Sequence, residues 1–134
     1  MTYVFDACAL IAYVRGEPGD AIVEDILLDP RSECYIHAIN ACEVFYDFVR
    51  TSEVLVASSV IQDLKGSGII ISEDFDSDLW QPAGVLKANV KRISLADAIA
   101  ITFADRIGAT LVTSDHKEFD PLVELDLCEI LFIR

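Results

Sequence analysis

The fold class is decided by the stretch TYVFDACALIAYV at residues 2–14. Its first part, Thr2–Phe5, is a short apolar run that is typical of a buried strand. Asp6 follows directly, and Ala7–Val14 has the composition of a helix that Asp6 can cap at its N-terminus. A strand that leads through an aspartate into a helix predicts one unit of an α/β fold.

The same alternation of short apolar runs and helical patterns continues along the chain. Further strands are expected at Cys34–Ile36, Ile69–Ile71, Thr110–Thr113 and Cys128–Ile133. Helices are expected at Asp20–Leu28, Ile39–Lys65 with a break near Thr51-Ser52, Glu73–Val90 with a kink or break at Pro82 and Gly84, and Ser94–Ile107 with Gly108 as its C-terminal cap. A loop is expected at Ser114–Leu122. We therefore predict a single domain over residues 1–134, a three-layer α/β/α sandwich around a mostly parallel sheet.

The composition is that of a folded protein with a strongly negative charge. The 134 residues include 23 Asp and Glu against 10 Lys and Arg, a formal charge of −13, and 53% of them are hydrophobic. This hydrophobic content excludes a disordered chain. The longest stretch without a charged residue has nine residues, about half of what a membrane helix needs, so no membrane span is expected. The beginning of the sequence lacks the basic flank of a secretion signal, so we expect a cytoplasmic location.

Taken alone, the charge favours a protein partner with a basic surface. A surface this acidic repels nucleic acid, because most of the affinity for nucleic acid comes from cations that neutralise phosphates. Lys87, Lys91 and Arg92 place three of the ten cations close together. They follow acids along one predicted helical region, however, and the helix dipole favours that order.

The four cysteines indicate neither a zinc site nor disulfides. Cys8, Cys34, Cys42 and Cys128 contain no C-x-x-C pair and match no zinc-binding spacing. Each lies among apolar residues, so all four are expected to be buried as small hydrophobic side chains.

Three aspartates occupy positions where a carboxylate is unusual. Asp6 and Asp115 lie just beyond predicted strands, and ligands of parallel sheets bind at the carboxyl ends of the strands. Asp97 falls on the apolar side of its predicted helix, where a carboxylate must be paired, protonated or bound to metal. Ordinary interpretations also exist, because Asp6 and Asp115 can be caps or loop residues and Asp97 can form a capping box with Ser94.

Glu43 lies at the edge of the polar stripe of its predicted helix. An exposed helix surface explains this position, which also suits a residue that overlooks a cleft. If Glu43 and the three aspartates converge, their mutual repulsion requires a cation. Carboxylate oxygens favour Mg²⁺ or Mn²⁺ over zinc, and these ions activate water and stabilise charge on a phosphate. Metal-assisted phosphodiester hydrolysis is therefore the hypothesis that the residues themselves support.

Four segments of the chain resemble the PIN-domain family, and in particular its small VapC-type toxins. They are Tyr3–Leu10, Cys42–Val44, Ser94–Ala98 and Ala109–Asp115 with Phe119, and they cover nearly the whole chain in the order of the family. The resemblance implies a Mg²⁺- or Mn²⁺-dependent ribonuclease that is the toxin of a toxin–antitoxin pair. It implies that Asp6, Asp97 and Asp115 hold metal directly or through water. Glu43 would bind the metal through water or position the attacking hydroxide.

The resemblance also marks one departure and one additional position. The family usually has Asn or Ser two positions after the first aspartate, where this chain has Cys8, and a thiol hydrogen-bonds poorly beside a hard metal. In some relatives a further acid after the fourth motif assists, and Glu118 or Asp120 could fill that place. The implied partners are an RNA substrate, a basic antitoxin protein and a second copy of the chain.

Two other functions fit part of the pattern. A catalytically idle PIN-like module would keep the fold, carry Cys8 as a trace of lost activity and bind a basic protein partner. A phosphoaccepting receiver is also α/β with acids at strand ends. It needs an acidic pair beside the first strand, however, where Asp6 stands alone.

Overall fold

A five-stranded parallel sheet forms the centre of the structure, a computed structural model that describes residues 1–90 and 92–134. Lys91, one of the three clustered cations, lies outside the described residues. The strand order is β3-β2-β1-β4-β5, and every neighbouring pair is parallel. The strands are β1 (Thr2–Phe5), β2 (Glu33–His37), β3 (Ile69–Ser72), β4 (Thr110–Thr113) and β5 (Ile130–Phe132).

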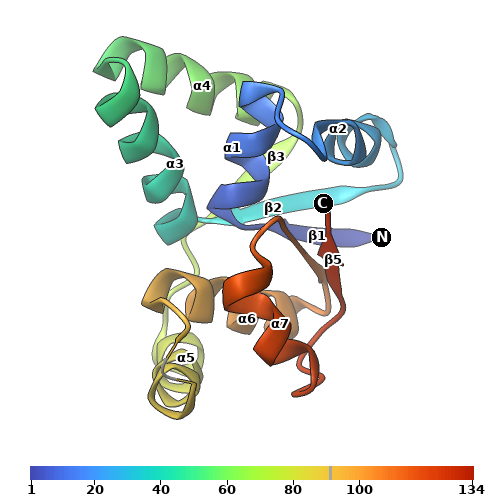
Figure 1. Cartoon of the computed structure of the whole chain (residues 1–134), viewed down its shortest axis with the longest axis vertical. Coiled ribbons are helices and arrows are strands. Elements are labelled where there is room, and N and C mark those ends of the chain that lie inside the picture. Colours follow the sequence, from blue (N-terminus) through green and yellow to red (C-terminus); the bar gives the residue numbers. More distant parts are fainter. Residues whose placement is uncertain (91) are drawn as a thin grey trace.

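The helices cover the two faces of this sheet as separate groups (Figure 1). One group consists of α1 (Ala7–Arg15), α2 (Asp20–Leu28), α3 (Ala38–Thr51) and α4 (Val54–Gly66). The other consists of α5 (Ser77–Asn89), α6 (Leu95–Ile107) and α7 (His116–Val123). Side chains alternate along β1, so that Phe5 packs with the first group and Val4 with the second. This is the predicted α/β/α sandwich.

The sequence pattern located most elements correctly. The bounds predicted for β1, α2 and β4 are those of the structure. The expected break near Thr51-Ser52 separates α3 from α4. Gly108 ends α6 in the left-handed conformation (φ 67°), and its N–H donates to the Ala104 carbonyl, as expected of a C-terminal cap.

Of the kink or break predicted at Pro82 and Gly84, the break is wrong. The helix begins at Ser77, after the cap Asp76, and continues through Pro82 and Gly84. Proline removes one backbone hydrogen bond and strains the preceding turn. Leu79 and Ala83 of α5 are buried, however, and the helix packs against α6. Tertiary packing of this kind supplies most of the stability of a helix in a protein.

The predicted loop at Ser114–Leu122 is also wrong, because it contains α7. Asp115 caps this helix by accepting a hydrogen bond from the Glu118 N–H (3.0 Å). Phe119 and Leu122, three residues apart on one side of α7, are buried against the sheet. The sequence pattern does not predict this helix, because its apolar stripe is short, the residues around it are polar and Pro121 lies within it.

Two cysteines are exposed, which corrects the prediction that all four are buried. Cys34 is buried and Cys128 partly so, whereas Cys8 and Cys42 are exposed. In α1, Ala7 and Ala9 face the core and Cys8 between them faces outward. Apolar neighbours in the sequence therefore did not imply burial, because a helix turns by about 100° per residue.

The strand order reverses at β1, which has β2 on one side and β4 on the other. In open parallel sheets, such a switch point leaves a crevice beyond the carboxyl ends of the two strands. Asp6 directly follows β1, and Asp115 follows β4 after one intervening residue. The topology thus brings together the two aspartates that sequence reasoning placed at strand ends.

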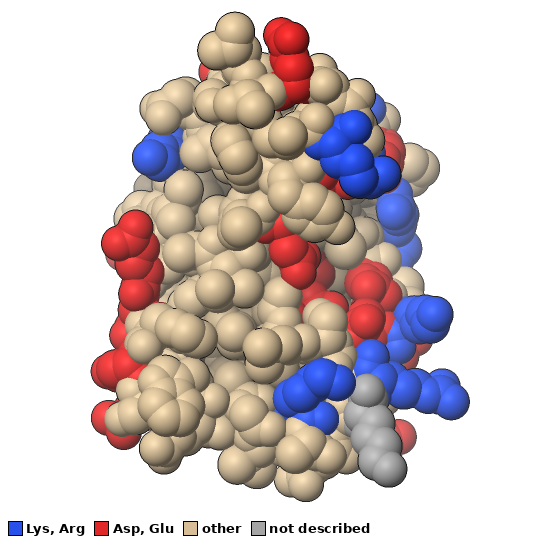
Figure 2. Space-filling model, turned by 90° about the vertical axis from the view of Figure 1, so that its left-hand side faces the viewer, with Lys and Arg blue, Asp and Glu red and all other residues tan. Residues whose placement is uncertain are grey.

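The surface charge is unevenly distributed. Figure 2 shows the side of the molecule with α3 and α5, on which uncharged residues predominate. Exposed apolar side chains on the helices of this side include Tyr46 of α3, Leu55 of α4 and Trp80 of α5. Within residues 1–90 and 92–134, no helix is both long and apolar enough to cross a bilayer.

Candidate acidic metal centre

Asp6 lies at the junction of the two central strands and is completely buried. Its backbone N–H donates to the Val112 carbonyl of β4 (3.1 Å). Its Oδ1 accepts from the Ala9 N–H (2.9 Å), so Asp6 caps α1. Burial raises the pKa of Asp6 to about 7, and the carboxylates of Asp97 and Asp115 contribute to the rise. Asp6 therefore caps α1 and also lies near other acids, so both interpretations of this residue hold.

Thr113, which sequence reasoning missed, connects Asp6 to Asp115. Its buried hydroxyl donates to Asp6 Oδ2 and accepts from the Asp115 N–H (3.0 Å). One hydroxyl thus holds the side chain of one strand-end acid and the backbone of the other. The only signal in the sequence was a threonine two residues before an aspartate, which is equally typical of an ordinary turn.

Asp97 lies in the first turn of α6, where its N–H donates to Ser94 Oγ (3.1 Å). The Ser94 N–H donates to Glu118 Oε2 (2.9 Å), so Glu118 of α7 takes the acceptor role that a capping box would give to Asp97. Burial raises the pKa of Asp97 to about 7, and Glu118, Glu43 and Asp115 add to the rise. A capping box therefore does not account for the Asp97 carboxylate.

Asp97, Asp115 and Glu118 form the tightest group of acids. Each brings one carboxylate oxygen to within 4.8 Å of the others. Asp115 and Glu118 are held together by the N-terminal cap of α7. Two oxygens on opposite sides of a Mg²⁺ ion are about 4.2 Å apart, so small side-chain shifts would let all three bind one ion.

Helix α3 contributes two further residues, Glu43 and Asn40, to the region of the clustered acids. Burial raises the pKa of Glu43, and Glu118 raises it further. Asn40 is buried, and its Nδ2 donates to the carbonyl of Ala96, the neighbour of Asp97 (3.3 Å). Within the described part of the chain, Asn40 Oδ1 has no hydrogen-bond partner. A buried unpaired oxygen next to clustered acids is available to a water or an ion.

Of the two additional acids, the structure brings Glu118 and not Asp120 into this group. Asp120 is exposed and accepts a hydrogen bond from His116 Nδ1 (2.9 Å). Glu118 lies in the first turn of α7, three residues after Asp115, and its side chain reaches the start of α6. The sequence pattern does not show which of these two acids joins the group, because it predicts a loop where α7 lies.

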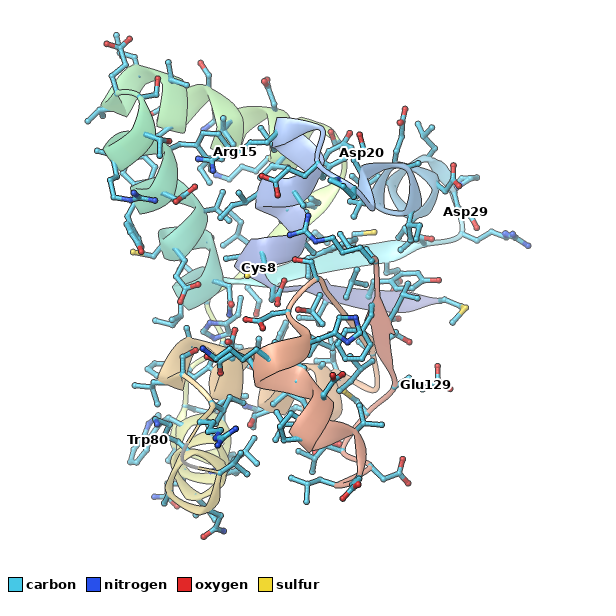
Figure 3. The ribbon with its side chains drawn as sticks, viewed as in Figure 1. Cys8, Arg15, Asp20, Asp29, Trp80 and Glu129 are labelled. Atoms are coloured by element: carbon cyan, nitrogen blue, oxygen red, sulfur yellow. The ribbon has the colours of Figure 1, made fainter. Side chains whose placement is uncertain are left out.

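Cys8 lies in the first turn of α1, beside the strand ends (Figure 3). Desolvation of its thiol raises its pKa to about 12, and the carboxylates of all four predicted site residues contribute. The thiol therefore stays protonated at neutral pH. It offers a neutral group where a thiolate would add another negative charge.

The donor set fits a hard divalent cation. The three clustered ligand atoms are carboxylate oxygens, which Mg²⁺ and Mn²⁺ prefer. Burial is the main cause of the raised pKa values of Asp6, Asp97 and Glu43, and neighbouring carboxylates add to them; a bound cation would favour the ionised forms. Such an arrangement is suited to hydrolysis at a phosphate, because the cation activates water and neutralises charge on the phosphate.

Several solved structures share the fold of this chain, and two of the three named below are VapBC structures. VapBC-1 from nontypeable Haemophilus influenzae has a TM-score of 0.76 at 16% identity, with 99% of this chain and 98% of that chain covered. VapBC2 from Rickettsia felis, bound to a promoter DNA fragment, has a TM-score of 0.77 at 20% identity, with 98% of each chain covered. PAE2754 from Pyrobaculum aerophilum has a TM-score of 0.63 at 18% identity, with 97% of this chain and 92% of that chain covered. The TM-scores establish a shared fold, and at these low identities they establish the fold alone.

The family is established by a separate comparison. No curated protein matches the chain closely enough to serve as a relative. The family model of the PIN domain matches residues 3–123, which contain all five acids of the centre. The chain therefore belongs to the PIN domain family.

Proposed function

We propose that this protein is a Mg²⁺- or Mn²⁺-dependent endoribonuclease. The observation that carries the proposal is the convergence of strand-end and helix-start acids at the β1–β4 switch point, with crowded negative charge. Membership of a family whose VapC-type members are nucleases supports the same reaction class. A cytoplasmic location agrees with this proposal, since RNA is the substrate.

In this proposal the residues have distinct roles. Asp97, Asp115 and Glu118 hold the cation through carboxylate oxygens. Asp6 completes the centre from β1, with Thr113 fixing its orientation. The chemistry supplied by a bound cation is activation of water and neutralisation of charge on the phosphate.

Glu43 acts on the attacking water in this proposal. Its carboxylate accepts a hydrogen bond from that water and orients it toward the phosphorus. A pKa raised by burial and by Glu118 makes Glu43 a better proton acceptor than an ordinary exposed glutamate.

The experiment is cleavage of a fluorescent structured RNA with Mn²⁺, Mg²⁺ or EDTA. We expect cleavage only with a divalent cation, and a decrease of at least about a hundredfold in Asp97→Asn and Asp115→Asn. Asp120→Asn is the matched control, because it removes an exposed acid from the same helix as Glu118. Cleavage that persists in EDTA, or in both centre variants, would refute the proposal.

We also propose that the protein is a toxin controlled by a basic antitoxin protein. One similar solved structure is described as a toxin–antitoxin complex from Klebsiella pneumoniae, and another as a member of the VapBC family of toxin–antitoxin systems. A formal charge of −13 complements a basic partner and gives fast, specific association. Co-purification of a small basic protein with this one, followed by an assay of RNA cleavage with that protein added, tests the pairing.

A single domain and a homodimer complete the proposal. Two apolar cores on one continuous sheet support one domain over residues 1–134. The largely uncharged side in Figure 2 supports contact between two copies, and so do exposed Tyr46 and Trp80 on the helices α3 and α5 of that side. Tyr46→Glu and Trp80→Glu should each shift the mass measured by light scattering from dimer to monomer, whereas Val123→Glu on α7 should not.

A catalytically idle binding module is the second candidate, and Cys8 is the observation that favours it. Cys8 replaces the small polar residue expected beside the metal, and its thiol is desolvated among the acids. Calorimetric titration with Mn²⁺ separates the two candidates. Binding that is lost in an Asp6→Asn/Asp115→Asn double variant supports the nuclease, whereas absence of binding in the unaltered protein supports the module.

A further inference from the structure

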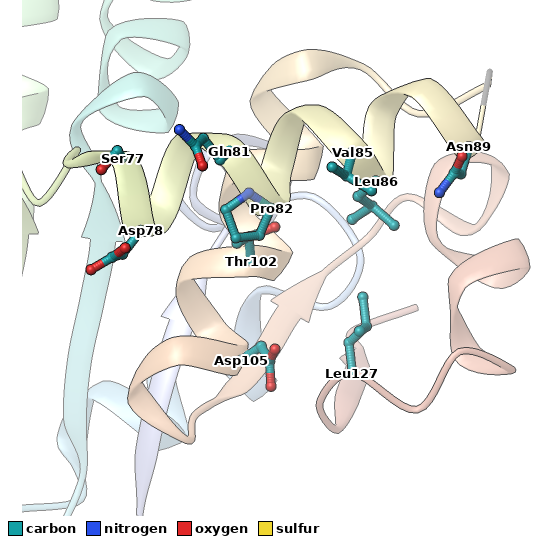
Figure 4. A pocket seen from close by; sticks show the side chains of 10 residues that line it. All are labelled: Ser77, Asp78, Gln81, Pro82, Val85, Leu86, Asn89, Thr102, Asp105 and Leu127. Atoms are coloured by element: carbon teal, nitrogen blue, oxygen red, sulfur yellow. The ribbon is translucent and has the colours of Figure 1, made fainter.

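A groove of about 530 Å³ lies between α5, α6 and the segment before β5 (Figure 4). None of its lining residues belongs to the acidic centre. On α6 the groove is lined by Thr102 and Asp105, whereas Asp97 lies at the other end of the helix. The eight residues from Asp97 to Asp105 correspond to about 12 Å along the helix axis. The groove is therefore a separate feature of the surface.

Part of the groove is an uncovered apolar wall. Pro82, Val85 and Leu86 line it from α5, and Leu127 lines it from the other side. Figure 4 shows Leu127 pointing toward Leu86 across the opening. Val85 remains 61% exposed. Apolar surface that stays in contact with water in this way can be covered by a partner.

The rest of the groove is rich in hydrogen-bond acceptors. The carboxylates of Asp78 and Asp105 and the hydroxyl of Thr102 line it. Pro82 has no N–H, so the Asp78 carbonyl four residues earlier lacks its usual helical donor. Residues that carry acceptors therefore line the groove beside the apolar wall, and they favour a ligand group with several N–H donors.

Arg106, the cation next to the groove in the sequence, balances only part of the acidic charge there, because Asp74, Asp76 and, at longer range, Asp78 of the groove share its charge. Arg106 forms ion pairs with Asp74 (3.3 Å) and Asp76 (2.8 Å). Both of those acids precede α5, and they occupy the guanidinium. Asp78 and Asp105 therefore add negative charge to a region where the nearby arginine is already shared by two carboxylates.

We propose that this groove binds a basic amphipathic segment of a partner protein. An arginine or lysine of the segment pairs with Asp78 and Asp105, and its apolar side chains cover Pro82, Val85 and Leu127. Charge complementarity is the reason for choosing a basic partner, because the groove is acidic and the whole chain carries −13. The proposal does not depend on the nuclease function, since the two sites share no residue.

The test uses a fluorescein-labelled helical peptide, as long as α5, made of leucine, alanine and arginine. We expect it to bind the full-length protein and to shift the NMR methyl signals of Val85, Leu86 and Leu127. Asp78→Asn/Asp105→Asn should weaken binding by about tenfold. Glu24→Gln/Asp25→Asn, which removes the same charge from exposed positions of α2, should weaken it by less than about threefold.

Two comparisons can overturn the proposal. A peptide of serine and arginine should bind more weakly than the leucine-containing peptide, because it cannot cover the apolar wall. Equal binding of the two peptides, or an equal loss in both double variants, would mean attraction by net charge alone and would refute a specific groove. Shifts confined to residues around Asp97 and Asp115 would equally refute it. RNA cleavage by Asp78→Asn/Asp105→Asn should be unchanged, so this result is independent of the nuclease test.

Discussion

Thr113 controls the acidic centre without contributing a charge. Its hydroxyl is the hydrogen-bond link between the Asp6 carboxylate and the Asp115 backbone. Thr113→Val keeps the shape and removes both bonds. We expect a loss of about 1–3 kcal/mol in the free energy of unfolding, because a buried acceptor loses its donor. We also expect about tenfold weaker Mn²⁺ binding, measured by calorimetry.

Two variants make the test of Thr113 specific. Thr113→Ser keeps the hydroxyl and should restore most of the Mn²⁺ affinity. Thr110→Val, on the same strand but at its far end, should leave the affinity unchanged. If Thr113→Val binds Mn²⁺ as tightly as the unaltered protein, the threonine has no positioning role.

Burial of the acids, with a smaller contribution from their mutual repulsion, also makes stability depend on pH. The pKa values of Asp6 and Asp97 are raised from 3.8 to about 7, so between these values the folded protein keeps protons that the unfolded chain has released. The free energy of unfolding of the metal-free protein should therefore fall as pH rises from 5 to 8. Thermal melts in EDTA measure this decrease, which Asp6→Asn should reduce.

A divalent cation should act in the opposite direction. It binds the ionised carboxylates, so the stabilisation by Mn²⁺ should be larger at pH 8 than at pH 5.5. Stabilisation that is equal at the two pH values would show that the ion binds elsewhere on the acidic surface.

The two helices α6 and α7 are joined by Glu118, which has both a structural and a proposed ligand role. Its Oε2 accepts a hydrogen bond from the Ser94 N–H at the start of α6. One of its carboxylate oxygens also lies within 4.8 Å of carboxylate oxygens of Asp97 and Asp115. Glu118→Gln keeps an acceptor for Ser94 and loses the charge. We expect nearly unchanged stability in urea and at least about tenfold weaker Mn²⁺ binding.

Glu118→Ala separates the two roles. It removes the acceptor as well, so we expect an additional loss of about 1–2 kcal/mol in stability. Glu124→Gln, an exposed acid just after α7, is the control. A Glu118→Gln variant with normal Mn²⁺ affinity would assign this residue to capping alone.

The elements explain why the sequence predicted some site residues and missed others. Asp6 and Asp115 were predictable because a short apolar run stops at each of them, and Asp97 because it interrupts an apolar helix face. Glu118 depends on α7, which has only a short apolar stripe and contains Pro121. Its contact with Ser94 joins residues 24 positions apart, which no local pattern contains.

The topology of the sheet was predictable as a class but not in detail. Alternating strands and helices predict a parallel sheet with right-handed crossovers. The strand order, with its reversal at β1, depends on which strands pair, and short apolar runs of similar composition do not encode that choice. The order nevertheless determines the candidate site, because the pairing of β1 with β4 brings Asp6 and Thr113 together.

Net charge should give the two proposed macromolecular partners opposite responses to salt. A chain with a charge of −13 repels RNA everywhere except where divalent cations reverse the local sign. With Mn²⁺ saturating, added KCl screens that repulsion, so RNA affinity should hold steady or rise between 50 and about 200 mM, against the usual decrease. Affinity for a basic antitoxin should fall over the same range, because screening weakens attraction.

Fluorescence anisotropy with each partner measures how both affinities change with salt on one protein preparation. A steep loss of RNA affinity with salt would show that basic side chains, rather than the divalent cations, hold the RNA.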